Sequence, residues 1–295
     1  MTFYEKRSRF GRINNTSQGG EYIQVRGKFT ETQSDHFMNR HEIIQQYQDA
    51  IYNIYHEENL TCLRGLDNSY QLKDKQLLQW HSETTRKCKV KYGQFNSFKN
   101  IDDLLLHSDE VMYFTAQLYL YRPYINNPLR EAFRTSTKTV YPNNQNLEAK
   151  RYNIYADIAM EKLYNYWHRI GDLIASFFPD LIKPERVYFP TAFDIIPEQF
   201  HEHDSYKWLK EFRETTYKKL NGKRKEIVHY TSSDTDIRYK HLNVATEKEG
   251  IEKWVEERNS IPDFFKEQMP ILLDGFYQTI TLLEIIDKEI FKDVE

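Results

Sequence analysis

The chain has 295 residues, of which 39% are hydrophobic, 15% aromatic and 29% charged, and its formal net charge at pH 7 is -3. This length fits one large domain or two small ones, with enough aromatic residues to build a sizeable core. Only 10 glycines and 9 prolines are present, which argues against an all-β protein with many tight turns and favours long helices. The nearly balanced charge excludes no class of ligand, since a mildly acidic protein can still carry a local basic cleft.

The two cysteines, Cys62 and Cys88, share no CxxC spacing and have no zinc-type histidine pattern nearby. We therefore expect two reduced thiols and no metal site. No apolar run approaches the ~20 residues of a membrane span, and no apolar signal segment follows the charged residues 1–7. These features predict a cytoplasmic protein that does not enter a membrane.

The N-terminal residues, 1 to about 34, are polar and mildly basic, and residues 21–26 alternate weakly, as in a short strand. We favour a tail or irregular arm here, and an arm that touches nucleic acid is the alternative. Apolar residues then recur at steps of three and four from His36 to near Asn59, which predicts a helix with Asp35 as its N-cap.

A second, shorter helix is indicated by the apolar residues between Leu72 and Trp80. The basic run at 86–92 that follows is either an edge strand with outward lysines or a phosphate-facing patch, and we favour the solvated strand. We treat residues 1–95 as an N-terminal extension of short helices that allows a short strand pair.

Four amphipathic helices are predicted in the remainder of the chain. Apolar stripes indicate helices over Asn100–Tyr121, 147–178, His203–Tyr230 and from Pro262 to the C-terminus. The connection at 122–146 reads as a polar loop. Broad apolar faces of this kind are typical of a helical bundle, so we predict an all-α fold, a four-to-five-helix up-down bundle over residues 96–295.

Local signals refine these helices. Asn100 or Asp102 is expected to cap the first of them, and Pro270 is expected to kink the last. Gly222 costs about 1 kcal/mol relative to alanine inside the third, so either that helix bends there or a ligand or backbone approaches closely. The polar residues 231–236 are expected to end the third helix in a loop.

The C-terminal part of the third helix carries Arg224, four residues, and His229. A five-residue step turns by about 500°, so the two residues lie roughly 140° apart and about 7.5 Å apart along the axis. They do not share one tight face, but both can border a cleft at the helix end. A permanent cation beside a group that titrates near neutral pH suits chemistry on a phosphodiester.

Four amphipathic helices with Arg-x4-His near the end of the third resemble the HEPN superfamily (higher eukaryotes and prokaryotes nucleotide-binding), in particular an uncharacterised bacterial branch. The residues that carry the resemblance are 159–164 and 169–173 in the second bundle helix and 224–230 in the third. The resemblance covers roughly residues 95–292. It implies a homodimer in which two motifs face one cleft, and RNA cleavage without a metal or other cofactor.

The resemblance places the catalytic roles on Arg224 and His229. His229 has the titration range for proton transfer to or from RNA, and Arg224 can donate two parallel hydrogen bonds to phosphate oxygens. Active members often have a short polar residue directly after the arginine, where this chain has Lys225. A non-catalytic module that binds a nucleotide, RNA or a protein is therefore the alternative function.

Four lysines crowd the same stretch and could hold an RNA backbone, or simply form a solvated basic helix end: Lys218, Lys219, Lys223 and Lys225. Tyr230 could stack on a base, although packing is the favoured interpretation. Glu161 and Asp172 lie in the second bundle helix, where some family members keep a polar residue that orients the motif. A role in bacterial defence, with an antitoxin or another protein as partner, is also implied.

A metal-like cluster at His201-Glu202-His203-Asp204 precedes the third helix. Histidines two residues apart face away from each other on a helix. We interpret this cluster as a turn or N-cap and not as a metal site.

Overall fold

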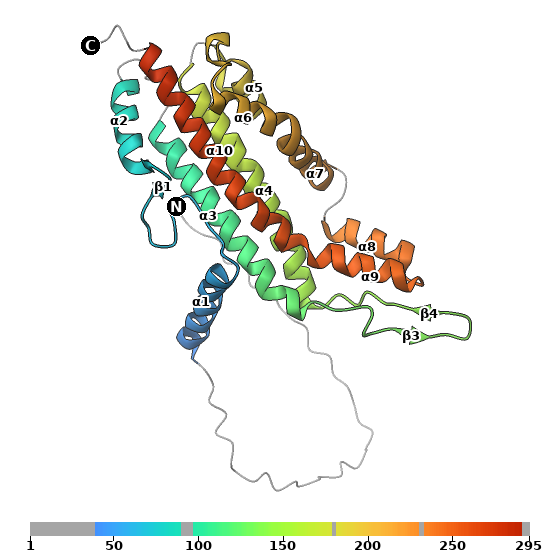
Figure 1. Cartoon of the computed structure of the whole chain (residues 1–295). Helices are drawn as coiled ribbons and strands as arrows, with labels where there is room; N and C mark the ends of the chain where they lie inside the picture. The colour runs from blue at the N-terminus through green and yellow to red at the C-terminus, as the bar shows by residue number, and fades with distance from the viewer. Residues whose placement is uncertain (1–38, 90–96, 179–180, 230–232, 291–295) are drawn as a thin grey trace, which may run out of the picture.

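The computed structural model describes residues 39–89, 97–178, 181–229 and 233–290, and Figure 1 shows their arrangement. The described chain is almost entirely helical, in agreement with the predicted all-α fold. The N-terminal part contains α1 (Arg40–Glu57), β1 (Gln71–Leu72), β2 (Lys75–Gln76) and α2 (Leu77–Lys89). The remaining elements are α3 (Ser97–Tyr121), η1 (Arg122–Tyr124), β3 (Phe133–Arg134), β4 (Thr139–Val140), α4 (Leu147–Ala175), η2 (Pro184–Arg186), α5 (Phe189–Asp194), η3 (Glu198–Phe200), α6 (Asp204–Phe212), η4 (Arg213–Tyr217), α7 (Lys218–His229), α8 (Ser233–Val244), α9 (Lys248–Asn259) and α10 (Ile261–Ile290).

Three long helices, α3, α4 and α10, run side by side through the molecule, and α6 and α7 pack along the flank of this group (Figure 1). Helix α4 is the central one, because its buried residues recur on a wide face along its whole length. It begins at Asn146, whose side chain accepts a hydrogen bond from the Ala149 amide at 2.9 Å. This cap satisfies one of the amides that a helix start leaves without a partner.

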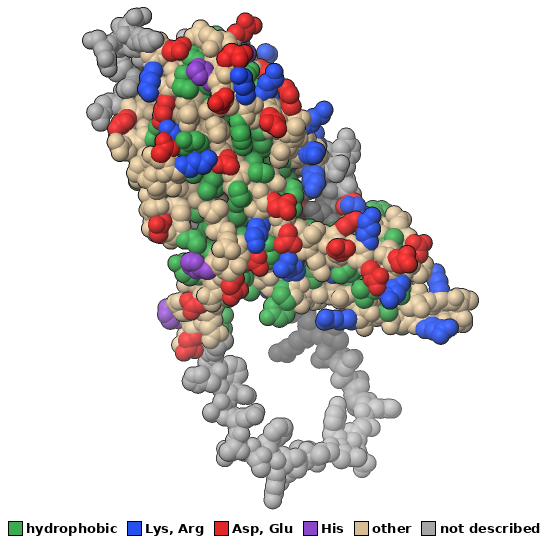
Figure 2. Space-filling view, in the orientation of Figure 1, with side chains coloured by type: hydrophobic (Ala, Val, Ile, Leu, Met, Phe, Trp, Pro, Cys, Tyr) green, Lys and Arg blue, Asp and Glu red, His purple; other side chains and the backbone are tan. Residues whose placement is uncertain are grey.

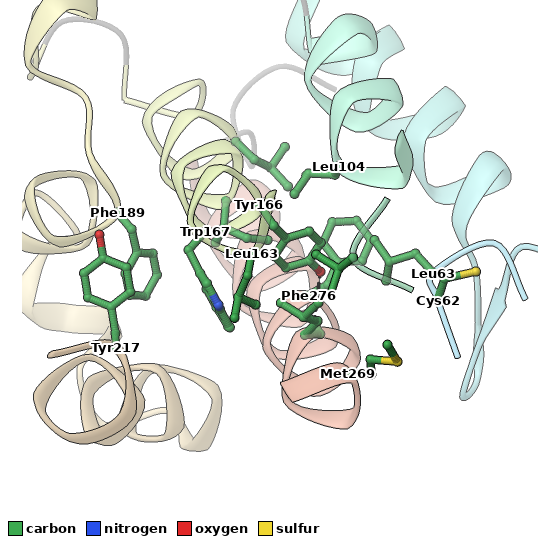
Figure 3. Packing of buried hydrophobic residues seen from close by; sticks show 14 of the residues in the cluster. Cys62, Leu63, Leu104, Leu163, Tyr166, Trp167, Phe189, Tyr217, Met269 and Phe276 are labelled. Atoms are coloured by element: carbon green, nitrogen blue, oxygen red, sulfur yellow. Dashed lines mark hydrogen bonds between the residues drawn. The ribbon is translucent and has the colours of Figure 1, made fainter. Parts of the chain in front are cut away.

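The core lies between α4 and α10, and Figure 3 shows its residues from close by. Tyr166 and Trp167 of α4 are fully buried, and the Tyr166 hydroxyl donates to the backbone carbonyl of Leu272 in α10 at 2.9 Å. Gly275 allows this close packing, since a Cβ atom there would overlap the ring of Trp167. The absence of a side chain at Gly275 therefore sets how closely α10 approaches α4.

Residues of the N-terminal part join the same buried cluster as the bundle helices. Leu63 and Leu77 are almost fully buried, and the Leu63 amide donates to the Ser108 hydroxyl of α3 at 2.8 Å. Cys62 is a buried free thiol, and burial raises its pKa to about 12. A thiol with that pKa stays protonated and unreactive near neutral pH.

Helices α8 and α9 form a smaller unit beside the bundle, with a cluster of their own around Ile237, Ile251 and Trp254. The Trp254 indole donates to the Ile237 carbonyl at 3.1 Å, which ties α9 to α8. The sequence analysis expected residues 231–236 to form a loop and did not predict α9. That expectation was wrong from Ser233 onward, because helices with so few apolar positions give only a weak periodic signal.

Several predicted boundaries also differ from the structure. The N-cap of α1 is Asn39, which forms a capping box with Glu42, and Asp35 lies outside the described residues. Helix α3 begins at Ser97, so Asn100 and Asp102 lie inside it and do not cap it. A strong cap residue at a sequence position does not by itself fix where a helix begins, because tertiary packing moves helix ends by a turn.

Three further segments correct the sequence-based prediction. The basic run at 86–92 is helical as far as Lys89, the end of α2, so it is not an edge strand there. The 122–146 connection is not only a polar loop, since it contains the antiparallel hairpin of β3 and β4, with Phe133 opposite Val140. The strand pair of the N-terminal part is β1–β2, with Gln71 opposite Gln76, whereas the weakly alternating residues 21–26 lie outside the described chain.

The last predicted helix is confirmed as α10, and Pro270 lies inside it without ending it. The helical stretch Lys248–Glu289, which spans α9 and α10, is long and apolar enough to cross a membrane by length and composition, within the residues that the structure describes. This corrects the expectation that no such run exists. Half of its apolar window is buried inside the molecule, as in a helix at the centre of a helical bundle.

Candidate functional site

Helix α7 carries the predicted arginine and lysines on the flank of the bundle. Leu220 is its buried anchor, and two cations lie against aromatic rings of neighbouring helices. The Lys223 ammonium is 4.2 Å from the ring centre of Phe264 in α10, and the Arg224 guanidinium is 4.3 Å from the ring centre of Tyr164 in α4. Cations prefer the electron-rich face of an aromatic ring, so these contacts hold α7 in a defined orientation.

The remaining lysines of the stretch, Lys218, Lys219 and Lys225, are exposed. Figure 2 shows basic side chains along the edge of the molecule where Figure 1 places α7. The predicted lysines therefore form a solvent-facing basic edge beside Arg224. This arrangement fits both interpretations of the sequence, a backbone-binding surface and a solvated helix end.

Arg224 is partly exposed, and no carboxylate of the described residues forms an ion pair with it. The guanidinium carbon lies 4.3 Å from the centre of the Tyr164 ring, and no described ion pair occupies the N–H groups of Arg224. An arginine without a carboxylate partner can donate two parallel hydrogen bonds to a ligand that has two acceptor oxygens. A phosphate group is such a ligand.

An aromatic cluster surrounds the Tyr164 ring. The ring of His168, one turn further along α4, stacks against it at 5.7 Å between ring centres, and the ring of Tyr217 lies 6.5 Å away. Tyr188, the exposed residue before α5, contacts His168 edge-on at 5.0 Å. Arg224 thus lies over one ring of a four-ring cluster drawn from α4, the start of α5 and the end of η4.

His168 is the residue of this cluster that the sequence analysis missed. Burial lowers its pKa below the ordinary value of 6.5; the nearby Asp172 opposes this shift, and the cations Arg169 and Arg224 add to it. Its Nε2 atom is buried and has no hydrogen-bond partner among the described residues. The signal in the sequence was the i, i+4 pair Tyr164 and His168, which places both side chains on one face of α4.

Asp172 and Glu161, the two predicted orienting residues, have different surroundings. Asp172 accepts a hydrogen bond from Arg169 at 2.6 Å, and Arg169 also approaches Asp103 of α3 at 3.5 Å. Glu161 is exposed on α4, one turn before Tyr164. Asp172 therefore lies close enough to act electrostatically on His168, whereas no described contact links Glu161 to the cluster.

The predicted partner of Arg224 is only partly placed. His229 is the last residue of α7, so its backbone is placed. Its side chain and the whole of Tyr230 lie outside what the structure describes. The proposed pairing of Arg224 with His229 therefore stays a prediction from the sequence.

The irregularity in the third helix lies at η4 and not at Gly222. Residues Arg213–Tyr217 form a π-helical turn between α6 and α7, where the Thr215 hydroxyl donates to the Glu211 carbonyl at 2.6 Å. The helix continues unbroken through Gly222, and a Cβ atom there would meet nothing within 4 Å. The expected bend at Gly222 was therefore wrong, and no protein backbone of the described residues comes close there; the extra residue per turn lies upstream, at η4. Close approach of a ligand at Gly222 stays a prediction.

The histidine-rich turn before α6 has structural roles. His203 occupies the N-cap position of α6, as the sequence analysis expected. The His201 Nε2 atom lies 2.9 Å from the Ile196 carbonyl, and Glu202 pairs with Lys207 at 2.9 Å. No group of three acidic, histidine or cysteine side chains in the described parts of the chain is arranged to hold a metal ion.

Comparison with known proteins assigns the chain to a family. A profile of the Cthe2314-like HEPN family matches residues 107–286, which is more than half of the chain and runs from α3 to α10. No curated protein and no solved structure matches the chain. The matched region contains Tyr164, His168 and Arg224, and the all-α architecture agrees with it. The chain belongs to the Cthe2314-like HEPN family.

Proposed function

We propose that the protein is a metal-independent endoribonuclease of the HEPN type, with Arg224 as its phosphate-binding residue. The observation that carries this proposal is the state of Arg224, which lies on the ring of Tyr164 without a described carboxylate partner. A guanidinium held by an aromatic face is oriented before a ligand arrives, so less conformational entropy is lost on binding. The basic edge of α7 supports the same conclusion.

The reaction needs two proton transfers around one phosphorus atom. A base takes the proton of the 2′-hydroxyl, the 2′-oxygen forms a bond to phosphorus, and the bond to the 5′-oxygen breaks as that oxygen receives a proton. The products carry a 2′,3′-cyclic phosphate and a 5′-hydroxyl. Arg224 would bind the non-bridging oxygens as negative charge builds on them. His229 of each subunit in a homodimer would supply the base and the acid.

We assign His168 a positioning role in this site. Its ring stacks on Tyr164, and Tyr164 carries the guanidinium of Arg224. A lowered pKa keeps the imidazole of His168 neutral near pH 7, so it adds no positive charge that would repel Arg224. A neutral ring at this position therefore favours the observed placement of Arg224.

The exposed lysines Lys218, Lys219 and Lys225 would contact the RNA backbone. Each phosphate contact releases counterions, so binding should weaken as the salt concentration rises. Lys223 would contribute less, because its ammonium already lies on Phe264. The tightness of RNA binding is thus expected to depend most on Lys218, Lys219 and Lys225.

The first prediction concerns cleavage by the variants Arg224→Ala and His229→Ala. Wild-type protein should cleave single-stranded RNA in the presence of EDTA and leave cyclic phosphate ends. Each variant should lose at least about a hundredfold in rate, the size expected for losing an electrostatic or acid–base contribution. The measurement is the single-turnover rate on labelled RNA, with circular dichroism as the check that each variant folds.

Matched controls are Arg134→Ala on β3 and His41→Ala on α1, both exposed and outside the site. They should cleave at the wild-type rate. Cleavage by both site variants at the wild-type rate would show that the site is wrongly assigned.

A non-catalytic module that binds RNA, a nucleotide or a protein is the second candidate, and Lys225 favours it. This residue stands directly after Arg224, where active relatives often have a short polar side chain. Salt-dependent RNA binding that requires Arg224, with no product at any protein concentration, would support the binding module over the nuclease.

A further inference from the structure

A second polar site lies where α9 meets α10, and it shares no lining residue with the Arg224 site. It is an open cleft of about 600 Å³, within the range of small-molecule sites in proteins. Its charged lining residues come from three segments: Arg122 and Arg130 from the η1 region, Glu256 and Arg258 from α9, and Asp263 from α10.

Arg258 is the unusual residue of this cleft, because it is 95% buried and has no carboxylate partner among the described residues. Its guanidinium donates to the Asn126 carbonyl at 2.5 Å and lies 4.5 Å from the ring centre of Trp254. Its Nε atom has no partner, and burial lowers its pKa to about 10. Among the described residues the carboxylate of Glu131 acts on it electrostatically but forms no ion pair with it, and a buried cation without an ion-pair partner is costly unless an anion compensates it.

Two more arginines lie on the open side of the cleft. Arg130 is exposed and forms no ion pair within the described chain. Arg122 is 3.3 Å from an Asp263 oxygen, but Asp263 is shared with the hydroxyl of Tyr119 at 2.6 Å. The arginines therefore outnumber the carboxylates, and Glu256 is the exposed negative charge at the rim.

The start of α10 faces the same space. This helix is 30 residues long and begins at Ile261, and both Ser260 and Asp263 line the cleft. The first N–H groups of a helix have no partner within it, and here Ile261 and Asp263 carry such groups whereas Pro262 has none. The N-terminal end of a helix also carries a partial positive charge that favours anions. The cleft thus combines guanidinium donors, a helix start and a buried cation.

We infer that this cleft binds a small phosphate monoester. Arg122, Arg130 and the start of α10 would hydrogen-bond to the phosphate group, with the buried charge of Arg258 behind them. A phosphate fits this set better than a monocarboxylate, since it offers more acceptor oxygens and a second negative charge to balance the excess of arginines. The volume of the cleft leaves room for the organic group on the phosphate.

The test is isothermal titration calorimetry of the full chain with ribose 5-phosphate, adenosine 5′-monophosphate and inorganic phosphate, and with ribose and adenosine as neutral controls. At least one ester should bind with one site per chain and at least about tenfold more tightly than its phosphate-free counterpart. Arg130→Gln and Arg122→Gln should each weaken binding at least about tenfold, whereas Glu256→Gln should tighten it by removing a repulsive charge.

Two control variants separate this site from the others. Arg134→Gln, on the exposed β3 strand, should bind the ester as the wild type does, and so should Arg224→Gln. Because Arg130 is exposed, its substitution tests the cleft without the risk of unfolding that a change at buried Arg258 carries. The inference fails if no ester binds, if the neutral controls bind equally well, or if inorganic phosphate binds as tightly as the esters. Loss of binding in Arg224→Gln with Arg130→Gln unaffected would also overturn it.

Discussion

Single side chains decide how the candidate RNA site is built. Arg224 depends on Tyr164 for its position, and Tyr164 in turn packs against His168. A permanent cation thus lies close to an imidazole that is partly removed from water. Burial disfavours the charged form of the imidazole, and the nearby cations disfavour it further. The protonation of His168 should therefore change the free energy of unfolding as the pH is varied.

His168→Gln tests this coupling through the dependence of stability on pH. The folded protein lowers the pKa of His168 below 6.5, so between the two pKa values the unfolded chain binds more protons than the folded one. Stability from this group is present above the unfolded pKa and is lost as the pH falls below about 6.5. The free energy of unfolding from urea titrations should fall with acidification in the wild type and fall less in His168→Gln.

His41→Gln on the exposed start of α1 is the matched control, and it should keep the wild-type slope. An unchanged slope in His168→Gln would contradict the description of His168 as a half-buried group that the folded protein keeps neutral.

At the scale of helices, the packing of α10 on α4 and the π-helical turn at η4 determine where the site residues lie. Gly275 lets α10 come close to Trp167. On its other side, Trp167 stacks on Phe212 of α6 with ring centres 3.9 Å apart. The position of α6, and hence of α7 after the π-helical turn, therefore follows from the α4–α10 contact.

A pair of glycine substitutions tests this packing. Gly275→Ala places a Cβ inside the ring of Trp167 and should destabilise the protein by about 1–3 kcal/mol through overpacking. Gly222→Ala adds a methyl group in open space inside α7 and should stabilise it by about 0.5–1 kcal/mol, because alanine loses less backbone entropy than glycine. Urea unfolding of both variants measures the difference.

This packing requires that the two substitutions change the free energy of unfolding in opposite directions. A Gly275→Ala variant as stable as the wild type would mean that α10 can shift away from Trp167 at little cost. Gly222→Ala should also leave RNA cleavage unchanged unless the RNA approaches closely at that position.

At the scale of the whole molecule, the proposed nuclease needs a second copy of the chain, because one subunit offers one motif. The basic edge of α7 lies on the outside of the bundle (Figure 2), where a partner can reach it. A homodimer with a shared cleft would bring one Arg224 and one His229 from each subunit to a single phosphate.

Adding an excess of inactive His229→Ala to wild-type protein tests the shared cleft. A mixed dimer has only one intact histidine and so lacks either the base or the acid, and the cleavage rate per wild-type chain should therefore fall as the variant is added. Sedimentation velocity at the assay concentration should give the mass of a dimer. A monomeric protein with full cleavage activity at that concentration would rule out the shared cleft.

The sequence by itself determined the long helices and the basic stretch around Arg224. Apolar residues at steps of three and four can be buried only on one side of a helix, so α3, α4 and α10 were predictable from their periodicity. Helices α8 and α9 were not, because few of their residues are buried. Helix ends were also off by a turn, since packing overrides the preferences of single cap residues.

Only the tertiary structure decided which residues meet. His168 and Arg224 are 56 positions apart (224 minus 168), and they approach the same Tyr164 ring because α7 packs on α4. Arg122, Arg130 and Arg258 meet in one cleft only because the start of α10 lies beside η1. Local sequence patterns report which side of a helix is buried, but the contacts between distant segments depend on how the whole set of helices packs.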